Sequence, residues 1–79
     1  MTRSQIFNEI RRAIEQSEGG ERTAEMHLQM IKFASALSEM TGREFCEGVG
    51  LSPSFGTEFL KMKRLLPRLV AANLDVDLI

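Results

Sequence analysis

Residues 41–63 read TGREFCEGVGLSPSFGTEFLKMK, and this stretch contains two helix-start signals separated by a turn centred on one glycine. Thr41 with Glu44 has the spacing of a capping box, which predicts the start of a short helix. Gly50 supplies a residue that adopts a positive φ without strain, as a tight turn requires. Ser52 then stands where the N-cap of the next helix is expected, with a proline at the first helical position.

The apolar residues of the same stretch indicate how its two helices pack. Two short helices that cross steeply around such a turn need an apolar residue followed by a small one where they approach each other. Phe45 and Cys46 occupy these positions, and Val49 and Leu51 flank the glycine of the turn. With this pattern the stretch resembles the helix-turn-helix of bacterial transcription regulators, which implies a second helix that faces DNA.

One position departs from the pattern of that family. The second helix of the family carries a branched apolar residue near its middle, and here Gly56 stands at that place. A glycine inside a helix costs up to about 1 kcal/mol relative to alanine. It also permits another backbone to approach closely. Further along the same helix, Phe59 and Leu60 are expected to face the core.

Helix signals continue on both sides of this stretch, and strand signals are nearly absent. Thr2 with Gln5 forms another capping box, and Gly19 with Gly20 ends the helix that follows. Pro67 is expected to close one helix and to open a short last one. The predicted fold class is therefore an all-α compact bundle of about five short helices in a single domain, residues 1–79. The expected helices span about 3–17, 22–40, 42–48, 53–65 and 67–72.

Apolar stripes with helical spacing support the first two of these helices. The first helix carries Ile6, Ile10, Ala13 and Ile14 on one side. The second carries Met26, Met30, Phe33, Ala34, Leu37 and Met40. Because the second stripe is the longer one, we expect the helix over 22–40 to be the central element of the bundle.

Composition and charge exclude several functional classes. The chain has 79 residues, of which 43% are hydrophobic and 27% charged, and its formal net charge is −1. A near-neutral chain is neither a whole-surface nucleic-acid coat nor a polybasic membrane binder. The apolar runs are too short for a membrane span, and no apolar signal region follows the N-terminus. The lone Cys46 fits a reducing compartment, so we expect a cytoplasmic protein.

The chain has few residues of the types that carry out catalysis or bind metal ions. The chain has one histidine and one cysteine, and it lacks both metal-ligand spacings and a glycine-rich phosphate loop. His27 has no second ligand at a suitable spacing. Glu44 is better assigned to its capping box than to acid–base chemistry. We therefore expect no cofactor, no metal, no catalytic residue and no enzymatic activity.

The resemblance places DNA contacts on the second helix of the stretch. It implies base or phosphate contacts by Ser52, Ser54, Thr57, Glu58 and Lys61. The local charge, and not the resemblance, adds Lys63, Arg64 and Arg68 as candidates for contacts with the DNA backbone. Residues 55–68 contain four cationic side chains and one carboxylate, so their local net charge is +3. Because such a patch suits phosphate binding, one hypothesis is a regulator that binds operator DNA as a dimer.

A second hypothesis is that the same helices bind protein. The base-reading positions carry no Arg, Asn or Gln, and these residues supply the commonest bidentate base contacts. The last third of the chain is apolar enough for an interface, either in a homodimer or with a transcription factor, although its residues also suit the core. These residues are Leu65, Leu66, Leu69, Val70, Leu74, Val76, Leu78 and Ile79. With a transcription factor as partner, the chain would act as an antiactivator that sequesters it. A third hypothesis is a structural module of a mobile element or a toxin–antitoxin locus.

Overall fold

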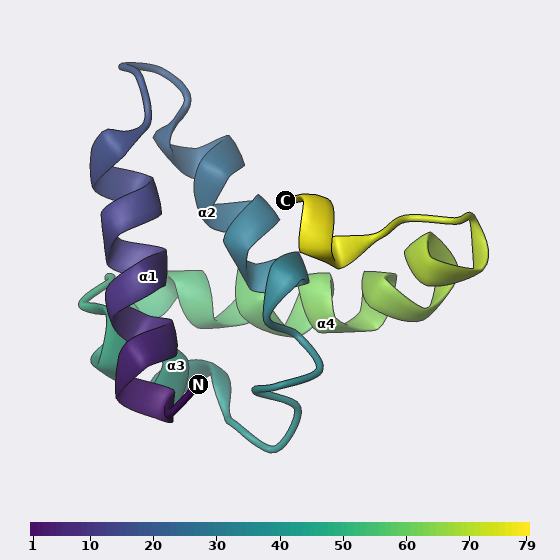
Figure 1. Ribbon diagram of the computed structural model, residues 1–79. Helices are drawn as coiled ribbons and strands as arrows, with labels where there is room; N and C mark the ends of the chain where they lie inside the picture. The colour runs from purple at the N-terminus through teal and green to yellow at the C-terminus, as the bar shows by residue number, and fades with distance from the viewer.

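The computed structural model describes all 79 residues and consists of helices and turns without a strand (Figure 1). In chain order its elements are α1 Arg3–Gln16, α2 Arg22–Lys32, α3 Gly42–Val49, the 3₁₀ turn η1 Pro53–Phe55, α4 Gly56–Ala71 and the 3₁₀ turn η2 Val76–Leu78. The predicted fold class, an all-α bundle that contains a helix-turn-helix, is confirmed. None of the helices is both long enough and apolar enough to cross a membrane.

Both predicted capping boxes begin helices in the structure. At α1, the Thr2 hydroxyl accepts from the Gln5 amide at 3.1 Å, and the Gln5 side chain accepts from the Thr2 amide at 2.6 Å. At α3, Thr41 and Glu44 make the same pair of bonds, at 3.1 and 3.0 Å. These bonds satisfy N–H groups that the first turn of a helix leaves without partners. The hydrogen bonds with Thr41, the backbone one foremost, hold the pKa of the Glu44 carboxyl below its ordinary value.

The four α-helices pack against one another in pairs. Helices α1 and α2 lie side by side and are joined at one end by the loop that contains Gly19 and Gly20 (Figure 1). Helix α4 crosses α2 and extends past the rest of the bundle, and α3 packs against both α1 and α4. After α4 the chain turns back, so that η2 lies against α2.

Side chains from all four α-helices meet in the core. Ile6, Ile10 and Ile14 of α1 follow each other at four-residue intervals and are all buried, as their stripe predicts. Full burial of an apolar side chain of this size stabilises the fold by roughly 1.5–3 kcal/mol. The core cluster comprises Ile6, Ile10, Ile14, Met26, Met30, Phe33, Leu37, Met40, Phe45, Cys46, Val49 and Phe59.

The helix predicted over 22–40 is wrong beyond Lys32, where α2 ends. From there to residue 40 the chain forms successive turns, mostly closed by bonds between residues three apart. The apolar stripe nevertheless stays buried, because turns of this kind keep side chains three or four residues apart on one side. The carbonyls of Ser38 and Met40 accept from the ammonium of Lys63 on α4, at 3.1 and 2.9 Å. This tertiary contact stabilises the turns in place of a continued helix.

The last two predicted helices, 53–65 and 67–72, are a single helix in the structure. Helix α4 runs through Pro67, although a proline in a helix interior removes a backbone donor and costs about 3 kcal/mol or more. Pro67 is exposed, so water can reach the carbonyl that loses its partner. At the other end Pro53–Phe55 form only a 3₁₀ turn, and Gly56 begins the α-helix instead of lying near its middle.

Candidate nucleic-acid interface

Helices α3 and α4 touch backbone to backbone at their first residues. A Cβ atom added to Gly42 would lie 2.6 Å from the carbonyl oxygen of Gly56 and 2.8 Å from its Cα. Both distances are far inside van der Waals contact, so only a residue without a side chain fits at position 42. Gly56 permits a close approach by another backbone, and the backbone that approaches it belongs to the first residue of α3. This contact sets how α4 crosses α3.

The turn between α3 and α4 closes at Gly50, which has φ 87° and ψ 34° as predicted for this glycine. Its amide donates to the Cys46 carbonyl at 2.8 Å and ends α3. Ser52 holds the N-cap position, but the prediction of a side-chain cap is wrong. The Ser52 hydroxyl lies 3.2 Å from the Ser54 hydroxyl, and the Ser52 carbonyl instead accepts from the amide of Phe55 at 3.0 Å. Both hydroxyls therefore remain exposed where the second helix begins.

Two stacked aromatic rings support the turn from behind. The ring centroids of Phe45 on α3 and Phe59 on α4 lie 4.2 Å apart, with an angle of 6° between the ring planes. Both residues are fully buried, and Cys46 beside them is buried as predicted. Desolvation raises the pKa of the Cys46 thiol, which keeps the sulfur protonated and unreactive. The helix-turn-helix thus rests on a tightly packed core.

Four exposed polar side chains of α4 share one face of the helix, and we call them the outer face: Thr57, Lys61, Arg64 and Arg68. Their spacings of four, three and four residues place them roughly 180° around the helix axis from the buried Phe59. Neither arginine forms an ion pair within the chain. The structure therefore brings together four of the predicted DNA-contacting residues on the side of α4 that faces away from the core.

Apolar side chains border the outer face. Leu60 is 42% exposed, so the prediction that it faces the core is wrong. Each residue of an α-helix advances by about 100°, so Leu60 cannot point at the same core as Phe59. Leu65, on the opposite edge of the outer face, is 46% exposed. The basic stripe of α4 is therefore flanked by a leucine on each side.

Glu58 lies between α2 and Lys61 of the outer face. One of its carboxylate oxygens lies 3.4 Å from Nε2 of His27, and the other lies 3.7 Å from Nζ of Lys61. The His27 Nε2 atom is buried and has no hydrogen bond of good geometry, so Glu58 is the polar group that it faces. A carboxylate placed between these two groups repels an approaching phosphate less than an unpaired one would.

Lys63 lies outside the outer face. Its ammonium sits 4.8 Å from the centroid of the Phe59 ring and donates to the Ser38 and Met40 carbonyls. A cation is favourable against carbonyls at the end of a helical segment. The structure thus gives Lys63 internal partners, and the exposed cations of α4 are Lys61, Arg64 and Arg68.

The residues predicted for a protein interface lie on the distal half of α4 and on the tail after it. The chain reverses at Asn73, which has φ 74°, and the Leu74 amide donates to the Leu69 carbonyl at 2.9 Å. Val70 and Leu78 are 53% and 85% exposed. The others are half-buried: Leu69, Leu74, Val76 and Ile79. None of the six belongs to the core cluster, so their apolar surface is incompletely covered.

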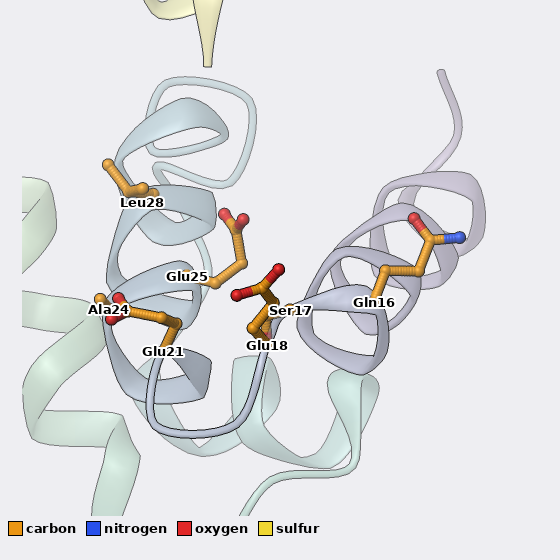
Figure 2. A pocket seen from close by; sticks show the side chains of 7 residues that line it. All are labelled: Gln16, Ser17, Glu18, Glu21, Ala24, Glu25 and Leu28. Atoms are coloured by element: carbon orange, nitrogen blue, oxygen red, sulfur yellow. The ribbon is translucent and has the colours of Figure 1, made fainter.

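An acidic cleft lies between the end of α1 and the start of α2 (Figure 2). Glu18 and Glu25 direct their carboxylates into this cleft, while Glu21 lies on its outer side. The carboxylates do not form a group that could hold a metal ion. These glutamates were not among the predicted site residues. The signal that could have found them is the presence of three carboxylates within residues 18–25.

Comparison with known proteins relates the chain to a described protein family. A family model described as an HTH-like domain matches residues 2–72, a range that contains all four α-helices, the turn and the outer face. Neither the curated proteins nor the solved structures contain a match to the chain.

Proposed function

The chain belongs to the HTH-like domain family, and on this premise we propose that it is a small transcription regulator that binds operator DNA through α4. The observation that carries this proposal is the outer face, where three cations stand exposed on the side of α4 opposite the core. The major groove, about 12 Å wide, admits an α-helix, and phosphates line both of its edges. A basic stripe along such a helix therefore meets negative charge over its whole length.

The side chains of this surface divide between base edges and phosphates. Hydroxyls and the nearest ammonium meet the bases or the first phosphates: Ser52, Ser54, Thr57 and Lys61. Arg64 and Arg68, one and two turns further on, bind backbone phosphates, for which the planar guanidinium is well shaped. Because Glu58 faces His27, we assign it to shaping this surface and not to reading cytosine.

We propose further that two copies pair through the distal half of α4 and the tail. Val70 and Leu78 leave apolar surface exposed there, and a two-fold interface would cover the same patch on both copies. Such a dimer would present two α4 helices to successive major grooves, about one helical turn of DNA apart.

Direct DNA binding predicts a steep dependence of affinity on salt. Three exposed cations per copy give a dimer about six phosphate contacts, so affinity for the promoter of its own gene should fall about 10³-fold between 50 and 200 mM salt. Fluorescence anisotropy of a labelled promoter duplex measures this. Arg64→Gln should flatten the plot of log K against log salt by about 0.9 per bound copy. Arg12→Gln, on the exposed side of α1, should leave the plot unchanged, and a parent protein that does not bind at low salt contradicts the proposal.

A second candidate function is sequestration of a transcription factor by this chain as an antiactivator. The apolar borders of the outer face and the exposed apolar tail support it, because leftover apolar surface on a small domain marks a protein-binding site. Complex formation in that case would need no DNA.

The double substitution Leu78→Ser with Ile79→Ser tests the apolar tail as the interface between two copies of the chain. Covering one large apolar side chain contributes roughly 1.5–3 kcal/mol, so the substitution should weaken self-association by more than about tenfold. Analytical ultracentrifugation measures the change. Leu28→Ser, which alters an exposed leucine on α2 beside the acidic cleft, is the matched control and should leave self-association intact. If the double variant pairs like the parent, the tail is not the interface.

A further inference from the structure

The first turn of α2 separates two surfaces of opposite character. On one side lies the acidic cleft with Glu18, Glu21 and Glu25. On the other side lie two adjoining hollows that share Ile14, Arg22 and Leu51 in their walls. We call the two hollows together the turn groove, because they lie against the turn that joins α3 to α4.

Arg22 is the free cation of the turn groove. It is exposed and forms no ion pair, although Glu18 and Glu25 stand only four and three residues away along the chain. Glu25 instead accepts from the side-chain amide one turn further along α2. Arg11, which lines the same groove, donates to the Gly48 carbonyl at 2.6 Å and is therefore already engaged. Only Arg22 keeps its full hydrogen-bonding capacity for a ligand.

The turn groove lies at the start of the helix that we place in the major groove. Leu51 belongs to the turn, Phe55 directly precedes α4, and both line the groove together with Arg22. A helix that enters the major groove by its first residues brings such a corner close to the phosphates at the groove edge. The apolar floor supports the methylene groups of an arginine and leaves its guanidinium at the surface. The acidic cleft on the far side of α2 repels DNA, which restricts the duplex to this side.

We propose that the turn groove is a second phosphate-binding site for the same duplex, with Arg22 as its charged group. The inference rests on the proposed function, because it uses the DNA that α4 enters. Glu15 is the carboxylate that also lines this groove, and it pairs with neither arginine. Arg22 adds one sequence-independent contact per copy on the side of the turn away from Arg64 and Arg68. Contacts at both ends of α4 hold the helix in register in the major groove of the DNA.

Arg22→Gln tests this site on a labelled mixed-sequence duplex of about 30 base pairs, roughly three helical turns. One lost contact should reduce affinity about eightfold per bound copy at 0.1 M salt and flatten the salt plot by about 0.9. Arg22→Lys should keep the slope, because the charge is retained. Arg12→Gln makes the same change of charge on the exposed side of α1 and should alter neither quantity.

The outcomes separate the site from the function. The Arg22 side chain makes no hydrogen bond or ion pair within the chain, so the Arg22→Gln variant should melt at the same temperature as the parent. A flatter plot of log K against log salt at an unchanged melting temperature supports the site. If the parent binds DNA and the Arg22→Gln variant has an equal slope, the turn groove is not a phosphate-binding site. The proposed function then still stands. A parent that binds no DNA overturns both.

Discussion

Replacing Phe59 by alanine is expected to remove a large part of the free energy of unfolding of this protein. The side chain is fully buried, stacks on Phe45 and lies beneath the ammonium of Lys63. Truncating a buried phenylalanine to alanine costs about 3–5 kcal/mol, because the cavity that remains is only partly refilled. A chain of 79 residues has a total free energy of unfolding of roughly 4–12 kcal/mol. Urea unfolding followed by circular dichroism measures the loss.

Leu60→Ala is the matched control for this experiment. Leu60 is the next residue of the same helix, but it is 42% exposed and outside the core cluster. Its truncation should lower the free energy of unfolding by less than about 1 kcal/mol. Equal losses for the two variants would show that α4 does not turn Phe59 toward the core.

Gly42→Ala is expected to have the second largest effect, a loss of about 2–3 kcal/mol in the free energy of unfolding. The new methyl group would lie 2.6 Å from the carbonyl oxygen of Gly56. That oxygen belongs to the backbone of α4 and cannot rotate away like the end of a side chain, so the two helices must separate. The gain in helix propensity, up to about 1 kcal/mol, offsets only part of this cost. Thermal unfolding should show a melting temperature roughly 8–20 °C lower.

Two other glycines provide the controls for this contact. An added Cβ at Gly19 meets no atom within 4 Å, so Gly19→Ala should leave the melting temperature unchanged or slightly raised. At Gly56 the nearest atoms of Gly42 lie 3.2 to 3.3 Å away, so Gly56→Ala should fall between the other two variants. A Gly42→Ala protein as stable as Gly19→Ala would contradict the backbone contact between α3 and α4.

The sequence predicted those features whose causes lie within a few residues of each other. The capping boxes of Thr2 and Thr41 begin helices, because donor and acceptor are three positions apart and need no other part of the chain. Gly50 takes its positive φ for the same local reason. The buried isoleucine stripe of α1 follows from helical periodicity alone. These local signals also located all four residues of the outer face, since their spacing is that of one helix.

Tertiary structure decided which of the candidate residues remain free for a partner. Lys63 and Lys61 are two residues apart, yet only Lys63 meets the carbonyls of Ser38 and Met40, more than twenty residues away in the chain. Likewise, Glu58 lies against His27, a residue of α2 that is 31 positions earlier in the chain.

The same distinction accounts for the errors in the helix boundaries. The turns after Lys32 are stabilised by a cation from α4, and α4 continues through Pro67 although local rules predict a stop there. The sequence by itself therefore determined where α3 begins and where the turn after it closes, but not where α4 begins. The packing of α4 on α2 and α3 determined which charges are satisfied inside the fold, because a distant hydrogen bond depends on three-dimensional proximity and not on spacing along the chain.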